Sequence, residues 1–86
     1  MNDTISALKQ ALELDRNGDW DGAHRIVQEI DSTASYSIHA YLHRKEGDLS
    51  NSQYWYRRAE KAMPEYGLDE EWNALYEQIT AQSEGS

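Results

Sequence analysis

Apolar side chains recur every three or four positions along most of the chain, the spacing that places them on one face of an α-helix. No stretch keeps the alternation of a half-buried β-strand over a strand's length. The pattern predicts an all-α fold with five helices, at about residues 4–16, 20–30, 36–46, 50–62 and 69–82. We expect residues 1–82 to form one domain and residues 83–86 to form a flexible polar tail.

Glycine, proline and capping residues mark the boundaries between these helices. Gly18-Asp19 and Gly47-Asp48 follow the first and third helices, and glycine readily adopts the left-handed conformation that ends a helix. Asp31-Ser32-Thr33 interrupts the pattern after the second helix with side chains suited to capping a helix start. Pro64 and Gly67 stop the fourth helix. Short turns of this kind predict two antiparallel helical hairpins, closed by the fifth helix.

The two hairpins are related by an internal repeat. Gly18-Asp19-Trp20 aligns with Gly47-Asp48-Leu49 at an offset of 29 residues. The same offset aligns three further pairs, Ala11 with Ala40, Val27 with Tyr56, and Ile30 with Ala59. A two-helix unit that cannot bury its own apolar face stacks on its neighbour, so the repeat predicts a short α-solenoid.

The second unit resembles a tetratricopeptide repeat. The match consists of aromatic and small residues around a Gly-Asp turn, ending in proline, at Tyr36, Ala40, His43, Gly47-Asp48-Leu49, Ser52, Tyr56, Ala59 and Pro64. The first unit has no proline, and its offset is shorter than the family's usual ~34 residues. The strings HAYLHRKEGD and YWYRRA also resemble a group of small bacterial proteins of unassigned function. The resemblance to tetratricopeptide repeats implies a non-catalytic scaffold that presents a concave groove to a protein or peptide.

Composition narrows the class of protein. The 86 residues contain no cysteine, which excludes disulfides, thiolate metal ligands and a thiol nucleophile. No apolar run approaches the roughly 20 residues of a membrane span, and the N-terminus lacks the pattern of a signal peptide. We therefore expect a cytoplasmic protein without a membrane partner. No phosphate-binding loop, nucleophile elbow or HExxH motif is present, so we expect no enzymatic activity; the best catalytic pairing would be His43 with Glu46 or Asp48.

Charge is distributed unevenly along an acidic chain. The net charge of −8 repels phosphate backbones, which argues against a nucleic-acid partner. Residues 41–58 nevertheless carry four basic and only two acidic side chains, together with several aromatic residues. Arginine and aromatic side chains are frequent at interface hot spots. We therefore expect this basic, aromatic segment to bind an acidic or C-terminal peptide of a partner, through Tyr41, Arg44, Lys45 and Arg57.

Three histidines form the one cluster of side chains that is suited to binding a metal ion. His39 and His43 are four residues apart and share a helix face, while His24 lies on the helix expected to pack beside them. Three imidazoles suffice to bind a divalent metal ion with one open position. Histidines at such packing positions are also often structural residues held by hydrogen bonds, and a cofactor is not implied by the repeat resemblance.

The first helix is apolar on nearly all sides. Leu8 and Leu12 lie on a different face from Ala7, Ala11 and Leu14. Such a helix needs cover on both sides. The fifth helix can supply it by folding back, and a homodimer through Leu8 and Leu12 is the alternative, as a structural assembly without a groove ligand.

Overall fold

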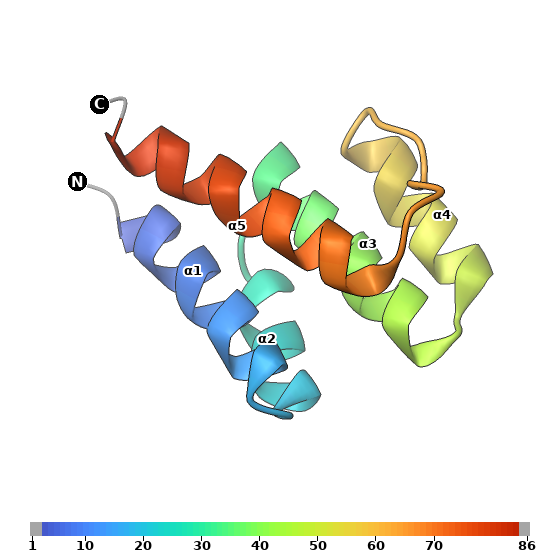
Figure 1. Cartoon of the computed structure of the whole chain (residues 1–86), viewed down its shortest axis with the longest axis horizontal. Coiled ribbons are helices and arrows are strands. Elements are labelled where there is room, and N and C mark those ends of the chain that lie inside the picture. Colours follow the sequence, from blue (N-terminus) through green and yellow to red (C-terminus); the bar gives the residue numbers. More distant parts are fainter. Residues whose placement is uncertain (1–2, 85–86) are drawn as a thin grey trace.

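The computed structural model describes residues 3–84, and these residues form five α-helices and no strand (Figure 1). The helices are α1 (Asp3–Arg16), α2 (Trp20–Val27), α3 (Thr33–Glu46), α4 (Leu49–Arg58) and α5 (Leu68–Glu84). α1 packs against α2 and α3 packs against α4, each pair forming a hairpin, and α5 packs on both α1 and α3. The predicted all-α fold with two hairpins and a closing helix is confirmed.

Glycine turns and aspartate caps define both hairpins. Gly18 and Gly47 have φ angles of 92° and 90°, the left-handed region that glycine enters without a Cβ clash. The Gly47 N–H donates to the Arg44 carbonyl at 3.1 Å, which satisfies one of the last carbonyls of α3. Asp19 then accepts a hydrogen bond from the Gly22 N–H at 2.9 Å and caps α2. The repeated Gly-Asp pair therefore ends one helix and starts the next.

Two helices are shorter than predicted. α2 ends at Val27 rather than Ile30, because Glu29 and Ile30 bond to carbonyls three residues back in a tighter turn. Ile30 still packs against the core, and its apolar side chain at helical spacing led to the prediction of a further helical turn. α4 ends at Arg58, and Glu60 takes a left-handed φ of 62°. α3 begins earlier than predicted, at Thr33, because Ser32 accepts a hydrogen bond from the Ser35 N–H.

α5 extends further than the predicted fifth helix. It reaches Glu84, so Ser83 and Glu84 are helical rather than part of a polar tail. Gly85 and Ser86, the rest of that predicted tail, lie outside the described residues. At the other end, the Glu70 carboxylate accepts a hydrogen bond from the Gly67 N–H at 3.1 Å, which satisfies a backbone donor at the start of the helix.

The core lies where α5 crosses α1 and α3. Leu8 and Leu12 of α1 are 0% exposed and pack in one cluster with Trp72 and Ile79 of α5. The Trp72 indole N–H also donates to the Leu12 carbonyl at 2.8 Å. α5 therefore supplies the cover that α1 needs, and neither Leu8 nor Leu12 is exposed for a second subunit. Full burial of one such leucine contributes about 1.5–3 kcal/mol.

None of the described helices combines the length and the apolar character that a membrane crossing requires.

The turn at Gly47 provides a test of this architecture. Gly47→Ala should lower the free energy of unfolding by about 1 kcal/mol, because a Cβ is strained at a φ of 90°. Gly67→Ala is the matched control, since Gly67 has no positive φ and a Cβ there would meet the Glu70 carboxylate only at an ordinary 3.7 Å. Urea denaturation of both variants measures the difference. Equal unfolding midpoints would contradict the left-handed cap.

Candidate metal centre

Tyr41 does not face an open groove as predicted. It is 3% exposed on α3, beneath α5, and its hydroxyl donates to the buried Asp15 carboxylate of α1 at 2.8 Å. Burial, together with the negative charge of Asp15, raises the pKa of the Tyr41 hydroxyl well above its ordinary value. Tyr41 is therefore a protonated donor inside the core, and the prediction that it lies at a partner surface is corrected.

The two basic residues predicted beside Tyr41 are already paired within the chain. Arg44 donates to the Glu71 carboxylate of α5 at 2.7 Å and to the Tyr66 carbonyl. Lys45 donates to the second oxygen of Asp15 at 2.9 Å. Glu71 and Asp15 are 1% and 2% exposed, so these pairs hold two buried carboxylates. The sequence could not reveal the pairing, because the partners lie 27 and 30 residues away along the chain.

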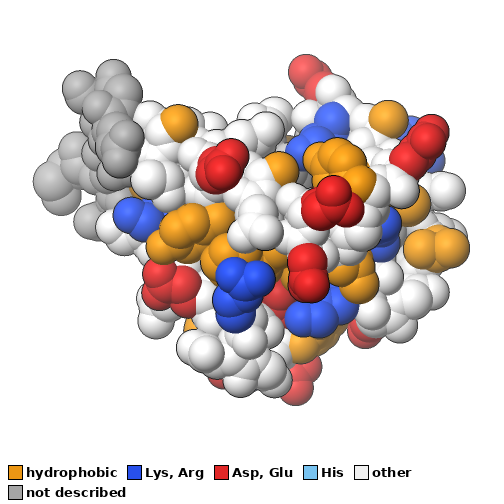
Figure 2. All heavy atoms as spheres, in the orientation of Figure 1, with side chains coloured by type: hydrophobic (Ala, Val, Ile, Leu, Met, Phe, Trp, Pro, Cys, Tyr) orange, Lys and Arg blue, Asp and Glu red, His pale blue; other side chains and the backbone are white. Residues whose placement is uncertain are grey.

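Arg57, the fourth predicted partner residue, is exposed on α4. No hydrogen bond or ion pair of its side chain is found within residues 3–84. In the view of Figure 2, basic side chains lie next to acidic ones rather than in an extended positive area. Two of the four cations of residues 41–58, Arg44 and Lys45, are therefore neutralised inside the fold.

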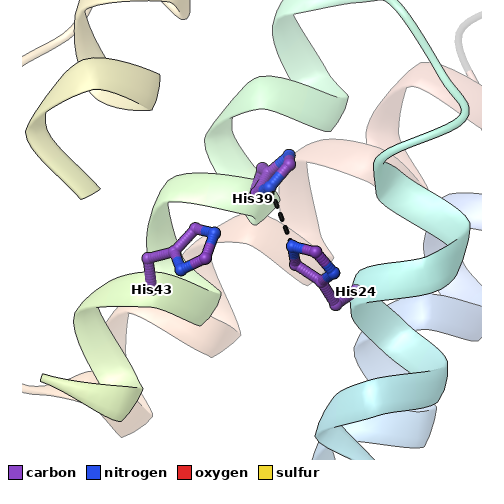
Figure 3. Close-up of side chains that lie close together, drawn as sticks. All are labelled: His24, His39 and His43. Atoms are coloured by element: carbon purple, nitrogen blue, oxygen red, sulfur yellow. Dashed lines mark hydrogen bonds between the residues drawn. The ribbon is translucent and has the colours of Figure 1, made fainter. Parts of the chain in front are cut away.

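The three histidines, in contrast, converge as predicted. His24 projects from α2 toward His39 and His43 on α3 (Figure 3), and one ring nitrogen of each lies within 4.8 Å of the others. The Nε2 atoms of His24 and His39 are 3.1 Å apart and share a hydrogen bond. Four residues separate His39 from His43, so their imidazoles stack with centroids 5.0 Å apart.

Polar contacts between α2 and α3 hold the histidines in register. The Trp20 indole N–H donates to the Leu42 carbonyl at 2.8 Å, and the Ser35 hydroxyl donates to the Val27 carbonyl at 2.9 Å. The first contact lies near the start of α2 and the second at its end. α2 is thereby fixed against α3 on both sides of His24.

Two tryptophans pack directly against the histidine rings. The Trp55 indole stacks on the His39 imidazole at 4.0 Å between centroids, with 12° between the planes. Trp20 stacks on His24 at 4.9 Å and 9°. These contacts restrict the rings to one orientation and remove much of their surface from water. His39 is only 5% exposed, whereas His24 is half-buried and gives the cluster its access to solvent.

Burial favours the uncharged form of His39 and of His24. Desolvation, reinforced by the neighbouring His24 and His43, lowers the pKa of His39 to about 4. Desolvation and His43 also lower the pKa of His24. Neutral imidazole, with a free lone pair, is the form that binds a metal ion.

Glu46 supplies an acidic partner that the sequence did not reveal as part of a metal site. Its carboxylate lies 2.7 Å from His43 Nδ1, and since a carboxylate only accepts, the Nδ1–H donates to it and Nε2 is the nitrogen available to a metal ion. Carboxylates orient metal-binding histidines in this way and make the ring a stronger ligand. The spacing of three residues within one helix is the signal that could have identified it. Asp48, the other candidate, caps α4 through the Asn51 N–H.

The Arg44–Glu71 pair yields a stability prediction. Arg44→Glu should lower the free energy of unfolding by about 3 kcal/mol or more, because it leaves the buried Glu71 carboxylate uncompensated and beside a like charge. Arg57→Glu reverses an exposed charge on α4 and should change stability by less than about 0.5 kcal/mol. Urea denaturation compares the two variants, and equal effects would show that Glu71 is not held by Arg44.

The histidine cluster yields a pH dependence in the metal-free protein. Because the pKa of folded His39 is about 4 against 6.5 ordinarily, the unfolded chain binds more protons between these values. Stability should therefore decline as the pH falls from 6.5 toward 4. Denaturation midpoints measured with a chelator present should fall less steeply over this interval in His39→Gln. The same slope in both proteins would mean that His39 protonates as easily folded as unfolded.

Comparisons of the chain with protein-family models, with curated proteins and with solved structures found no match.

Proposed function

We propose that the protein binds one divalent transition-metal ion through His24, His39 and His43. The observation that carries this proposal is the convergence of three imidazoles from two helices, with two of their Nε2 atoms 3.1 Å apart. Zinc lies about 2.0–2.1 Å from histidine nitrogen in tetrahedral sites, which separates neighbouring ligand atoms by about 3.3 Å. The His24–His39 pair is thus already near a ligand spacing, and the ion would replace the proton they share.

The second support for the proposal is the environment of the three rings. Glu46 accepts the Nδ1–H of His43, which leaves Nε2 as the nitrogen available to a metal ion. Trp20 and Trp55 hold His24 and His39 by stacking, so that little ring freedom is lost when an ion binds. An ion can reach the cluster from the side of half-buried His24.

The donor set favours a particular class of metal. Imidazole nitrogen suits zinc, nickel and copper, whereas calcium and magnesium prefer oxygen ligands. Three protein ligands leave a fourth position for water or another small ligand. Since His24 belongs to the first hairpin and the other two histidines to the second, the bound ion would cross-link the hairpins. The proposed role is metal binding, and no reaction is assigned to it.

The peptide-binding scaffold expected from the sequence has weaker support. Recognition through Arg44 and Lys45 would require a partner to break their ion pairs with Glu71 and Asp15. Removing one member of a buried pair typically costs about 3–5 kcal/mol. Such a partner would need to compensate that loss before gaining any affinity.

Isothermal titration of the purified chain with zinc at neutral pH tests the proposal. We expect one ion per chain, no binding by His39→Ala, and affinity about 10–100-fold lower for Glu46→Gln, which loses the carboxylate that orients His43. Arg57→Ala is the matched control, since it removes an exposed side chain outside the cluster and should bind like the natural sequence.

The structural alternative makes different predictions for the same titration. If the histidines serve only packing, the natural chain gives no binding heat, and His39→Ala merely unfolds at lower urea concentration. Nickel or copper in place of zinc then also gives no heat. That combination would falsify the metal-binding proposal.

A further inference from the structure

An open groove runs along the first hairpin, away from the histidines. It has a volume of about 500 Å³, and all of its lining residues lie between positions 7 and 30, so neither α3, α4 nor α5 covers it. Along α2 and its flanking turns the lining extends from Asp19 to Ile30. At about 1.5 Å per helical residue, these positions span roughly 16 Å, the length of three helical turns.

The walls of the groove are largely apolar. Half-buried side chains of α1, α2 and the following turn form its walls, namely Ala7, Leu14, Ile26 and Ile30. Gly22 contributes backbone to the lining, and the space that a Cβ would take there is filled by the Asp19 carboxylate, 2.4 Å away.

The charge around the groove is negative. Asp19 and Glu29 line it together with a single cation, Arg25. Asp21 and Asp31 are exposed on the same stretch of chain, and the protein as a whole carries a net charge of −8. An approaching basic segment is therefore attracted at long range, and an acidic one is repelled.

A second copy of the chain does not suit this groove. Two copies repel each other through their net charge of −8 each. A concave surface also needs a convex apolar ridge, and the large exposed hydrophobics of the described residues are Leu49, Tyr54 and Tyr66. Leu49 and Tyr54 lie on α4 and Tyr66 lies in the loop before α5, so the three do not form one ridge along a single helix.

We infer that the groove between α1 and α2 binds an amphipathic helix of another protein, about three turns long, with an apolar stripe and basic flanks. The stripe packs between Leu14 and Ile26, and basic residues beside it meet Asp19 and Glu29. Helices bind grooves of this kind by apolar anchors spaced three and four residues apart. This surface is separate from the histidines and does not rest on the proposed metal site.

Fluorescence anisotropy with a labelled synthetic helix tests the inference on the intact chain with a chelator present. The probe is a 14-residue peptide with leucines at positions 3, 7, 10 and 14, lysines along both edges of the stripe and alanines elsewhere. One control peptide keeps its composition but scatters the leucines around the helix. A second control replaces each lysine with glutamate.

The striped basic peptide should bind at least tenfold more tightly than either control. Adding 0.5 M NaCl should weaken its binding several-fold, because the screening length then falls to a few ångströms. Ala7→Gln should weaken it at least tenfold, because it fills the groove from half-exposed Ala7 without removing packed atoms. Leu49→Gln, which changes an exposed leucine on α4, should not weaken it. Circular dichroism verifies that both variants remain folded.

Three results would overturn the inference. Equal binding of the scattered peptide would show attraction by charge alone, and equal binding by Ala7→Gln would place the contact elsewhere. Sedimentation that reveals a dimer of the natural chain, lost in Ala7→Gln, would assign the groove to a second copy instead.

Discussion

The packing of α5 across α1 and α3 is the contact on which the rest of the structure depends. Two helical hairpins alone would leave Leu8, Leu12 and Leu42 on an open apolar surface, and α5 covers them with Trp72, Leu75 and Ile79. The hydrogen bond from the Trp72 indole to the Leu12 carbonyl fixes the position of α5 along the axis of α1. The surface that a repeat scaffold would offer to a peptide is thus occupied by the chain itself.

This closure also explains where the basic residues of α3 point. Arg44 and Lys45 lie at the border between the covered surface and solvent, where their charged groups reach Glu71 and Asp15. Tyr41 and Tyr56 donate to the same two carboxylates. Each buried carboxylate is therefore satisfied by one cation and one phenol, which makes the network specific for this arrangement of α1, α3, α4 and α5.

Local features of the chain were predictable because their physical cause lies within a few residues. The five helices, the left-handed glycines and the Asp19 cap follow from helical periodicity and turn chemistry. The histidine cluster was also predictable, since a spacing of four places His39 and His43 together and the hairpin order brings His24 beside them. The Glu46 contact follows the same logic at a spacing of three.

The ion pairs of the basic segment were not predictable, because they join residues that lie far apart in the sequence. Composition gives the charge of Arg44 and Lys45 but not the position of Glu71 across the fold. The predicted ends of the helices were wrong for a related reason. Ile30 packs against the core from a turn, so its burial and not its backbone conformation produced the helical pattern. Whether the hairpins belong with tetratricopeptide repeats stays a prediction.

The late position of α5 in the chain has a consequence for synthesis on the ribosome. Translation proceeds from the N-terminus, so both hairpins emerge before the helix that covers them. Until then Leu8 and Leu12 face solvent, and Arg44 has no Glu71 to pair with. During synthesis, apolar side chains of both hairpins therefore stay uncovered and Arg44 lacks its carboxylate partner until α5 has emerged.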